Sequence, residues 1–285
     1  MIAFARYLHV DYGLLASTVL EYLVHVCTAH TALGLESPGR GPNYKRVIKR
    51  LEVDAAACPD RAYCITASMV RMMGSCEEDQ DDADWFQVAI YMLFTGGRPI
   101  EVLGDDKKSA NDPRRADWRS TSWHASNGDL VDPFHPDMSY MLTGLQRKGD
   151  RLQIQTIPVF RTGEPSFCAA RQMGSRWHNQ GQPASGAIFG VAPSGKMIRQ
   201  YNFRAFLHRF EEQFGFPRLV PYGLRRATAT YLNISGIGAN LQMDFMGHKH
   251  PGTATHKRYV DPPPEPFKGF AAMLAVVRLT SYTRR

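Results

Sequence analysis

The spacing of apolar residues predicts two helices near the start of the chain. Residues 14–35 carry apolar side chains at helical intervals, and Gly34 near their end is a stop signal. A turn rich in Gly and Pro separates them from residues 43–52, where one helical face is apolar and the other is basic. The basic residues of this second helix are Lys45, Arg46, Lys49 and Arg50. We therefore expect an amphipathic helix with a strongly basic outer face.

A linker and a larger unit follow. Residues 53–65 lose the periodicity and contain a proline, whereas Thr66 is a suitable cap for a new helix. An acidic stretch at 77–84 then leads into an apolar helix that ends at Gly96. We therefore predict a helical domain at residues 1–55, a linker at 56–65 and a larger domain at 66–285.

The second half of the chain mixes strand and helix patterns. Residues 105–137 are polar and irregular, which is typical of a long insertion with a functional or disordered surface. Residues 138–160 predict two strands joined around a turn at 147–150, and the alternation at Leu152 and Ile154 supports the second strand. Helical patterns return at 200–214, 224–234 and 237–246. The fold class that we expect is mainly α with a small antiparallel sheet.

Composition narrows the class of protein without fixing it. Lys and Arg exceed Asp and Glu by 34 − 27 = 7, which suits a polyanionic partner such as nucleic acid. The five cysteines are odd in number and form no C-x-x-C pair, so we expect neither a disulfide framework nor a structural zinc site. We also expect no signal peptide and no membrane span, because no apolar run approaches the required length.

Three segments carry the residue types of one chemistry. They are Thr95–Leu103 at the end of the apolar helix, Tyr222–Thr230 at the start of a later helix, and Met246–His248 with Tyr259 downstream. Their order resembles the tyrosine recombinase (phage-type integrase) family, with its motifs T-G-x-R-x-x-E-L, H-x-x-R-R-x-x-A-T and L-G-H before a nucleophilic tyrosine. The resemblance implies a helical core-binding domain followed by an α+β catalytic domain.

The resemblance also implies a role for each motif residue. Attack on a phosphodiester raises the negative charge on its non-bridging oxygens, and the forked guanidiniums of Arg98 and Arg225 suit those oxygens. Glu101 is expected to orient the site. Tyr259 is the expected nucleophile, and Lys148, in the turn between two strands, is the expected general acid for the departing 5′ oxygen. The scheme requires no metal and no other cofactor.

Two features depart from the family pattern. Tyr222 stands where the family has His, and a tyrosine hydroxyl donates a hydrogen bond but is no acid or base at neutral pH. From His248 to Tyr259 is 259 − 248 = 11 residues, whereas the family usually has nine. His250 stands at the usual distance, 259 − 250 = 9. We prefer His248 because Met-Gly-His is the recognisable motif, with His250 and His256 as alternatives.

Each of these residues also has an ordinary structural role open to it. Arg98 suits a helix cap, and Arg225 with Arg226 suits a basic helix face. Lys148 stands in a turn, where lysine is common, and Arg147 is a weak substitute because a guanidinium rarely gives up its proton. These structural alternatives stay open at the level of the sequence.

Double-stranded DNA is the partner that the resemblance implies. The candidate DNA-contacting residues are Lys45, Arg46, Lys49, Arg50 and Arg226. The basic helix has the alternative of an ordinary solvated face. Residues 267–279 resemble the exchange helix of the family, which docks onto a neighbouring protomer, so a homo-tetramer on paired DNA sites is implied.

The expected function is that of a site-specific DNA recombinase with a covalent 3′-phosphotyrosine intermediate. Its expected location is intracellular and DNA-associated: the nucleoid of a prokaryote or the nucleus of a eukaryote. The alternatives are a telomere resolvase or type IB topoisomerase with the same chemistry, and a non-catalytic DNA-binding relative. The other tyrosines considered as nucleophiles, Tyr231 and Tyr282, are expected to pack in the core and in the tail.

Overall fold

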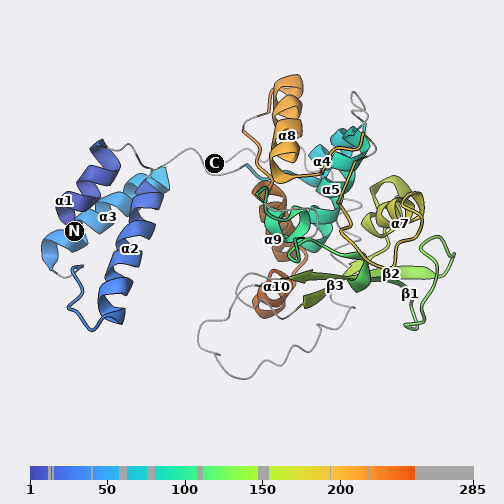
Figure 1. The fold of residues 1–285 in the computed structure, drawn as a ribbon, viewed down its shortest axis with the longest axis horizontal. Coiled ribbons are helices and arrows are strands. Elements are labelled where there is room, and N and C mark those ends of the chain that lie inside the picture. Colours follow the sequence, from blue (N-terminus) through green and yellow to red (C-terminus); the bar gives the residue numbers. More distant parts are fainter. Residues whose placement is uncertain are drawn as a thin grey trace. The chain divides into compact units, whose positions relative to one another are not determined.

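The computed structural model describes residues 1–11, 14, 16–39, 41–57, 63–75, 81–107, 112–146, 154–192, 194–216 and 218–247. The chain forms two compact units, Met1–Arg61 and Ala62–Arg285. Each unit has its own secondary-structure elements (Figure 1). Each also has its own core of buried apolar side chains. The functional assignment of these units, a DNA clamp at 1–55 and a catalytic domain at 66–285, stays a prediction.

The first unit consists of helices. They are α1 at Ile2–Arg6, a π-helical turn at Tyr7–Asp11, α2 at Ala16–Ala32 and α3 at Pro42–Ala57. The two helices predicted from the pattern are present as α2 and α3, although α3 continues into the predicted linker. Tyr44, Val47 and Ile48 of α3 pack against the core of the unit, whereas all four basic residues at 45–50 are exposed. The basic-faced amphipathic helix is confirmed.

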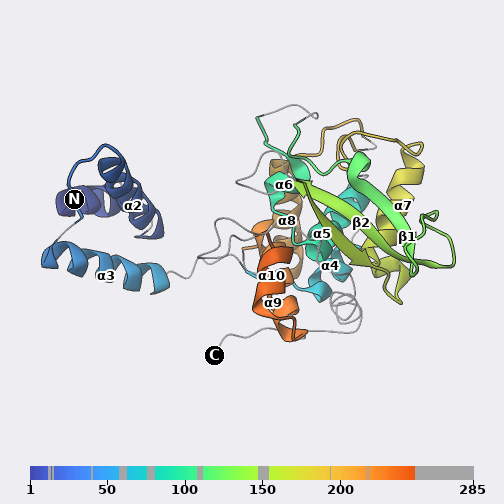
Figure 2. The ribbon, with the colours of Figure 1, turned by 90° about the horizontal axis from the view of Figure 1, so that it is seen from below.

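Helix α5, Asp82–Thr95, is the central helix of the second unit. Its apolar residues lie on every side, and almost the whole helix is buried. It contacts α4 at Ala67–Met73, α7 at Ala169–Asn179, α8 at Gln200–Phe214 and α9 at Tyr222–Ile234 (Figures 1 and 2). Its end is as predicted, because Gly96 takes the left-handed φ of 60° that favours glycine.

The other helices predicted before residue 247 are also present, whereas the helix expected at 267–279 lies outside the described residues. Thr66 caps α4 as expected, since its hydroxyl accepts a hydrogen bond from the Met69 N–H at 3.3 Å. The patterns at 200–214, 224–234 and 237–246 correspond to α8, α9 and α10, and α10 spans Ala239–Phe245. The shorter elements are α6 at Pro99–Leu103 and 3-10 turns at Trp118–Ser120 and Pro165–Phe167. None of the helices in the described part of the chain is long and apolar enough to span a membrane.

A three-stranded antiparallel sheet completes the second unit, in the order β1-β2-β3. Its strands are β1 at Thr121–Ala125, β2 at Met138–Gln146 and β3 at Ile154–Phe160. The two predicted strands are confirmed as β2 and β3. The structure corrects the interpretation of residues 105–137 as an irregular insertion, because this segment contains β1. Only Trp123 and Ala125 of β1 are buried, which is too short a pattern to recognise.

The start of β3 differs from the expected alternation of apolar and polar residues. Ile154 is 61% exposed, whereas Gln155 is buried. The Gln155 side-chain amide donates a hydrogen bond to the main-chain carbonyl of Asp244 in α10. This long-range hydrogen bond satisfies the buried amide, and the inward face at this point of the strand is therefore polar.

The acidic stretch before α5 holds that helix to its neighbours. Asp81 accepts a hydrogen bond from the Ser194 hydroxyl at 2.8 Å, and Asp82 accepts one from Arg209 of α8 at 2.6 Å. Asp84 forms an ion pair with Arg176 of α7, and both side chains are buried. Burial raises the pKa of the Asp84 carboxyl, and the charge of Arg176 opposes that rise. Asp81, Asp82 and Asp84 are therefore part of the packing of the second unit.

Removal of the buried guanidinium of Arg176 tests this packing. We predict that Arg176→Met lowers the free energy of unfolding by roughly 3–5 kcal/mol, because the carboxylate of Asp84 stays buried without its cation. The double variant with Asp84→Asn should recover part of the loss. Urea unfolding followed by circular dichroism measures both values. A loss below about 1 kcal/mol in the single variant would contradict a buried ion pair.

Candidate active site

Arg98 lies at the start of α6, directly after the turn that ends α5. Its guanidinium donates to Glu101 Oε1 at 2.5 Å, and its main-chain N–H donates to Oε2 of the same carboxylate at 2.8 Å. The Glu101 side chain is 2% exposed, whereas that of Arg98 is 19% exposed. Glu101 therefore holds the arginine from the protein side, and part of the Arg98 side chain reaches solvent. Arg98 is the N-cap residue of α6, so its capping role is at the start of this helix.

Arg225 connects the three motif segments. It lies in the first turn of α9 and is 1% exposed. One terminal nitrogen donates to the Gly96 carbonyl at 2.5 Å, and the other donates to the Met246 carbonyl. Thr228, one turn further along α9, donates its hydroxyl proton to the Leu93 carbonyl at 2.8 Å. Segments separated by more than one hundred residues are thus joined at one side chain.

The electrostatics of this position suit a cation. Gly96 follows the last residue of α5 and Met246 follows the last residue of α10. The carbonyl groups at a helix C-terminus lack partners within the helix and carry partial negative charge. The charge of Arg225 therefore has two compensating groups inside the protein. An ordinary exposed helix face, which the sequence left open for Arg225, is wrong.

The turn between α5 and α6 requires its glycines. A side chain at Gly97 would place its Cβ 2.7 Å from Val102 and 3.1 Å from Leu145 of β2. A side chain at Gly96 would place its Cβ 2.8 Å from the Met246 sulfur. The two glycines therefore let this turn pass close to the sheet and to the end of α10.

Of the candidate tyrosines, Tyr222 is exposed and Tyr231 is buried. Tyr222 is the first residue of α9 and is 46% exposed. Tyr231 is 1% exposed, and its hydroxyl accepts a hydrogen bond from the Ala67 N–H at 2.9 Å. Burial raises the pKa of Tyr231. Tyr231 packs in the core, as expected.

Several expected site residues lie outside the described residues. They are Arg147, Lys148, His248, His250, His256, Tyr259 and Tyr282. Of the candidate DNA-contacting residues, Arg226 is half-buried on α9, and the four on α3 are exposed. Among the residues that the structure describes, no group of three or more His, Cys, Asp or Glu side chains is arranged to hold a metal ion.

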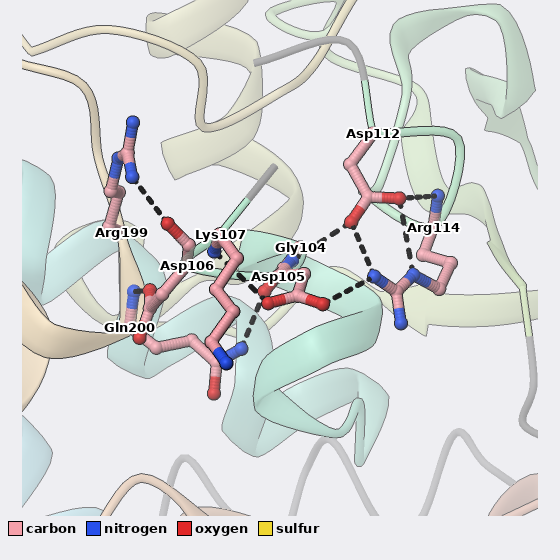
Figure 3. Close-up of polar contacts among 8 residues, drawn as sticks. All are labelled: Gly104, Asp105, Asp106, Lys107, Asp112, Arg114, Arg199 and Gln200. Atoms are coloured by element: carbon pink, nitrogen blue, oxygen red, sulfur yellow. Dashed lines mark hydrogen bonds and ion pairs between the residues drawn. The ribbon is translucent and has the colours of Figure 1, made fainter. Parts of the chain in front are cut away.

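Sequence reasoning missed a network in the loop that leaves α6 (Figure 3). Asp112 accepts hydrogen bonds from the Asp105 N–H at 2.9 Å and from the guanidinium of Arg114 at 2.9 and 3.1 Å. Arg114 also donates to the Asp105 carboxylate at 3.1 Å. Burial acts to raise the pKa of Asp112, but these hydrogen bonds outweigh it and lower the pKa to about 2. Asp112 is therefore charged near neutral pH.

The same loop contacts the start of α8. The Asp106 carboxylate accepts a hydrogen bond from the Gln200 N–H at 2.8 Å, and its carbonyl accepts one from Arg199 (Figure 3). The side chain of Gln200 donates to the Gly104 carbonyl at 2.5 Å. Asp-Pro-Arg at 112–114 is a typical turn sequence that could have indicated part of this network.

Of the comparisons with known proteins, only the one with solved structures finds similar proteins. No protein-family model matches the sequence, and no curated protein matches it. Among solved structures, the chain is similar to the Tn1549 transposon integrase, residues 82–397, in complex with circular intermediate DNA. The TM-score is 0.53 and the identity 14%, over 87% of this chain and 77% of that chain.

A second solved structure gives the same result. The chain is similar to lambda integrase, residues 75–356, solved as a dimer bound to a COC′ core site. The TM-score is 0.50 and the identity 13%, over 91% of this chain and 82% of that chain. Identities this low establish a common fold and no more. The chain therefore has the mainly α fold with a small antiparallel sheet that these integrases share.

Proposed function

We propose that the chain is a site-specific DNA recombinase that cleaves and rejoins strands through a covalent 3′-phosphotyrosine intermediate. One observation carries the proposal: the guanidinium of Arg225 joins the segments that hold the three motifs. The solved structures that share the fold are integrases in complex with DNA. The exposed basic face of α3 adds support, because phosphate contacts from such a face give salt-dependent DNA binding.

The proposed reaction needs a positive charge that stabilises the phosphate oxygens, a nucleophile, and an acid that protonates the leaving oxygen. The guanidinium of Arg98, whose side chain is partly exposed, is held by Glu101 and stabilises the charge that develops on the phosphate oxygens. Tyr259 attacks the phosphorus, and the bond to the 5′ oxygen breaks as Lys148 protonates that oxygen. At pH 7 the ionisation of an unperturbed tyrosine costs about 4 kcal/mol, which nearby positive charge reduces. The phosphotyrosine bond retains the energy for rejoining.

The remaining candidates complete the proposed site. Tyr222, an exposed residue, donates a hydrogen bond from its hydroxyl to a phosphate oxygen in place of an imidazole. His248 is the proposed catalytic histidine, and His250 supports it. Arg225 lies inside the protein, where it fixes the relation between the motif segments and brings positive charge near the site. The proposed partner is double-stranded DNA, and the proposed working form is a homo-tetramer on paired sites.

A second candidate function is a DNA-binding relative without catalytic activity. Two observations favour it: Tyr222 replaces a histidine, and the carbonyl groups of Gly96 and Met246 occupy the guanidinium of Arg225. A telomere resolvase or type IB topoisomerase would use the same chemistry as a recombinase. Formation of a covalent adduct separates the catalytic functions from the non-catalytic one.

One prediction of the proposed function concerns that covalent adduct. The probe is a library of duplexes with randomised sequence around a single 5′-bridging phosphorothiolate, whose thiol leaving group does not reverse the cleavage. The wild-type protein should form a denaturant-stable adduct, and mass spectrometry should place the DNA on Tyr259. Tyr259→Phe should form none, whereas Tyr201→Phe, at an exposed tyrosine of α8, should react normally. An adduct formed by Tyr259→Phe, or none formed by the wild type, would refute the proposal.

The second prediction concerns the general acid. Lys148→Ala should slow the cleavage of an ordinary phosphodiester by about 100-fold or more and leave DNA affinity unchanged. Cleavage of the phosphorothiolate should stay near the wild-type rate, because a thiol leaves without protonation. Single-turnover rates on both substrates make the comparison. Equal losses on both substrates, or a loss of DNA binding, would exclude the general-acid role.

A further inference from the structure

Helix α6 contains Glu101 and begins directly after Arg98, but it is too short to fix its own position. It spans five residues, Pro99–Leu103, and a helix of about one turn has little stability in isolation. Its entry is fixed by the glycine turn after α5, where the Gly96 carbonyl contacts Arg225. The exit of α6 at Gly104 must therefore be fixed by other groups.

The exit of α6 is held on two sides. On one side, Gln200 at the start of α8 contacts the Gly104 carbonyl and the Asp106 carboxylate. On the other side, Asp112 and Arg114 hold the main chain and carboxylate of Asp105 (Figure 3). The Asp112 side chain is fully buried, which makes this contact part of the packed structure.

Arg115 restricts the same exit from a third direction. Gly104 has a φ of 73°, and a Cβ at this position would lie 2.7 Å from the Arg115 side chain. Arg115 is buried and donates to the Phe189 carbonyl at 2.8 Å and to the Ile198 carbonyl at 3.2 Å. The backbone at Gly104 therefore passes between the groups that bind it and a guanidinium that is itself fixed.

The turns at residues 112–114 and 117–119 have the same internal hydrogen bonds, but they differ in their contacts with the rest of the chain. In Asp112-Pro-Arg114, one carboxylate accepts from the arginine N–H, Nε and a terminal nitrogen. Asp117-Trp-Arg119 repeats all three contacts. The Arg119 side chain, however, is 74% exposed. Among the described residues, the one distant group that donates to the Asp117 carboxylate is the Gly186 N–H, at 3.3 Å. The first turn alone of this pair contacts the exit of α6.

We infer that Asp112 and Arg114 are positioning residues for Arg98: they fix the exit of α6 and thereby the guanidinium that is to bind the DNA phosphate. They act through the main chain at Asp105 and do not themselves touch DNA. The catalytic consequence rests on the proposed function, whereas the ordering of α6 does not. The inference also gives the segment that follows α6 a role in the site.

The experiment uses the full-length protein with Asp112→Asn, and Asp117→Asn as the matched control. Hydrogen exchange is measured at the α6 amides, where Val102 and Gly104 bond to the carbonyls of Arg98 and Ile100. Asp112→Asn should raise their exchange rates about tenfold or more, with α5 unchanged, and Asp117→Asn should leave them unchanged. If Asp112→Asn does not fold, the second variant is Arg114→Lys, which keeps the positive charge but loses the paired donors of the guanidinium.

The catalytic arm measures single-turnover cleavage of the phosphorothiolate duplex. Asp112→Asn should slow cleavage about tenfold with DNA affinity unchanged, and should cause no further loss in an Arg98→Ala background. An equal loss in both backgrounds would show that Asp112 does not act through Arg98 and would overturn the inference, as would unchanged exchange at α6. Raised exchange in a protein whose wild type forms no adduct would support the positioning of α6 and refute the proposed function.

Discussion

Arg225 places a positive charge inside the protein, at a point where two helices end. The carbonyls of Gly96 and Met246 accept its hydrogen bonds, and they belong to the C-terminal ends of α5 and α10. A buried cation without such partners would be costly, so the ends of these helices and the start of α9 must stay together. The other parts of the candidate site depend on this constraint, because α6 begins at Pro99, just after the turn that contains Gly96.

The two motif arginines, Arg98 and Arg225, therefore differ in burial and in what they contact. Arg225 is in the interior and holds main-chain segments together, whereas Arg98 keeps part of its side chain in solvent and is held by Glu101. Helix α6 connects the two: Arg225 fixes its entry, and the contacts of Asp105 and Asp112 fix its exit. A short helix with both ends fixed can present a guanidinium in a defined orientation, which binding of a phosphate requires.

The sequence predicts those features that arise from neighbouring residues. Helix α5 and its end at Gly96 follow from a continuous apolar pattern and a glycine, and the cap of α4 follows from Thr66. Features that depend on distant residues were missed or reversed. Gln155 faces inward because its side-chain amide donates to a carbonyl in α10. Helix α7 was not predicted, because it contains Gly174, a weak helix former, and the close approach of Gly174 to Pro133 joins residues that are distant in the sequence. The partners of Arg225 likewise cannot be derived from local spacing.

The central claim is that the guanidinium of Arg225 holds the three motif segments together. The most direct test compares the unfolding free energies of Arg225→Met and of Arg226→Met, its half-buried neighbour on α9. Arg225→Met leaves two main-chain carbonyls without their donor and should cost about 2–4 kcal/mol, with faster hydrogen exchange in α6. Arg226→Met should cost less than about 1 kcal/mol. Equal, small losses in the two variants, with α6 still protected, would contradict the account.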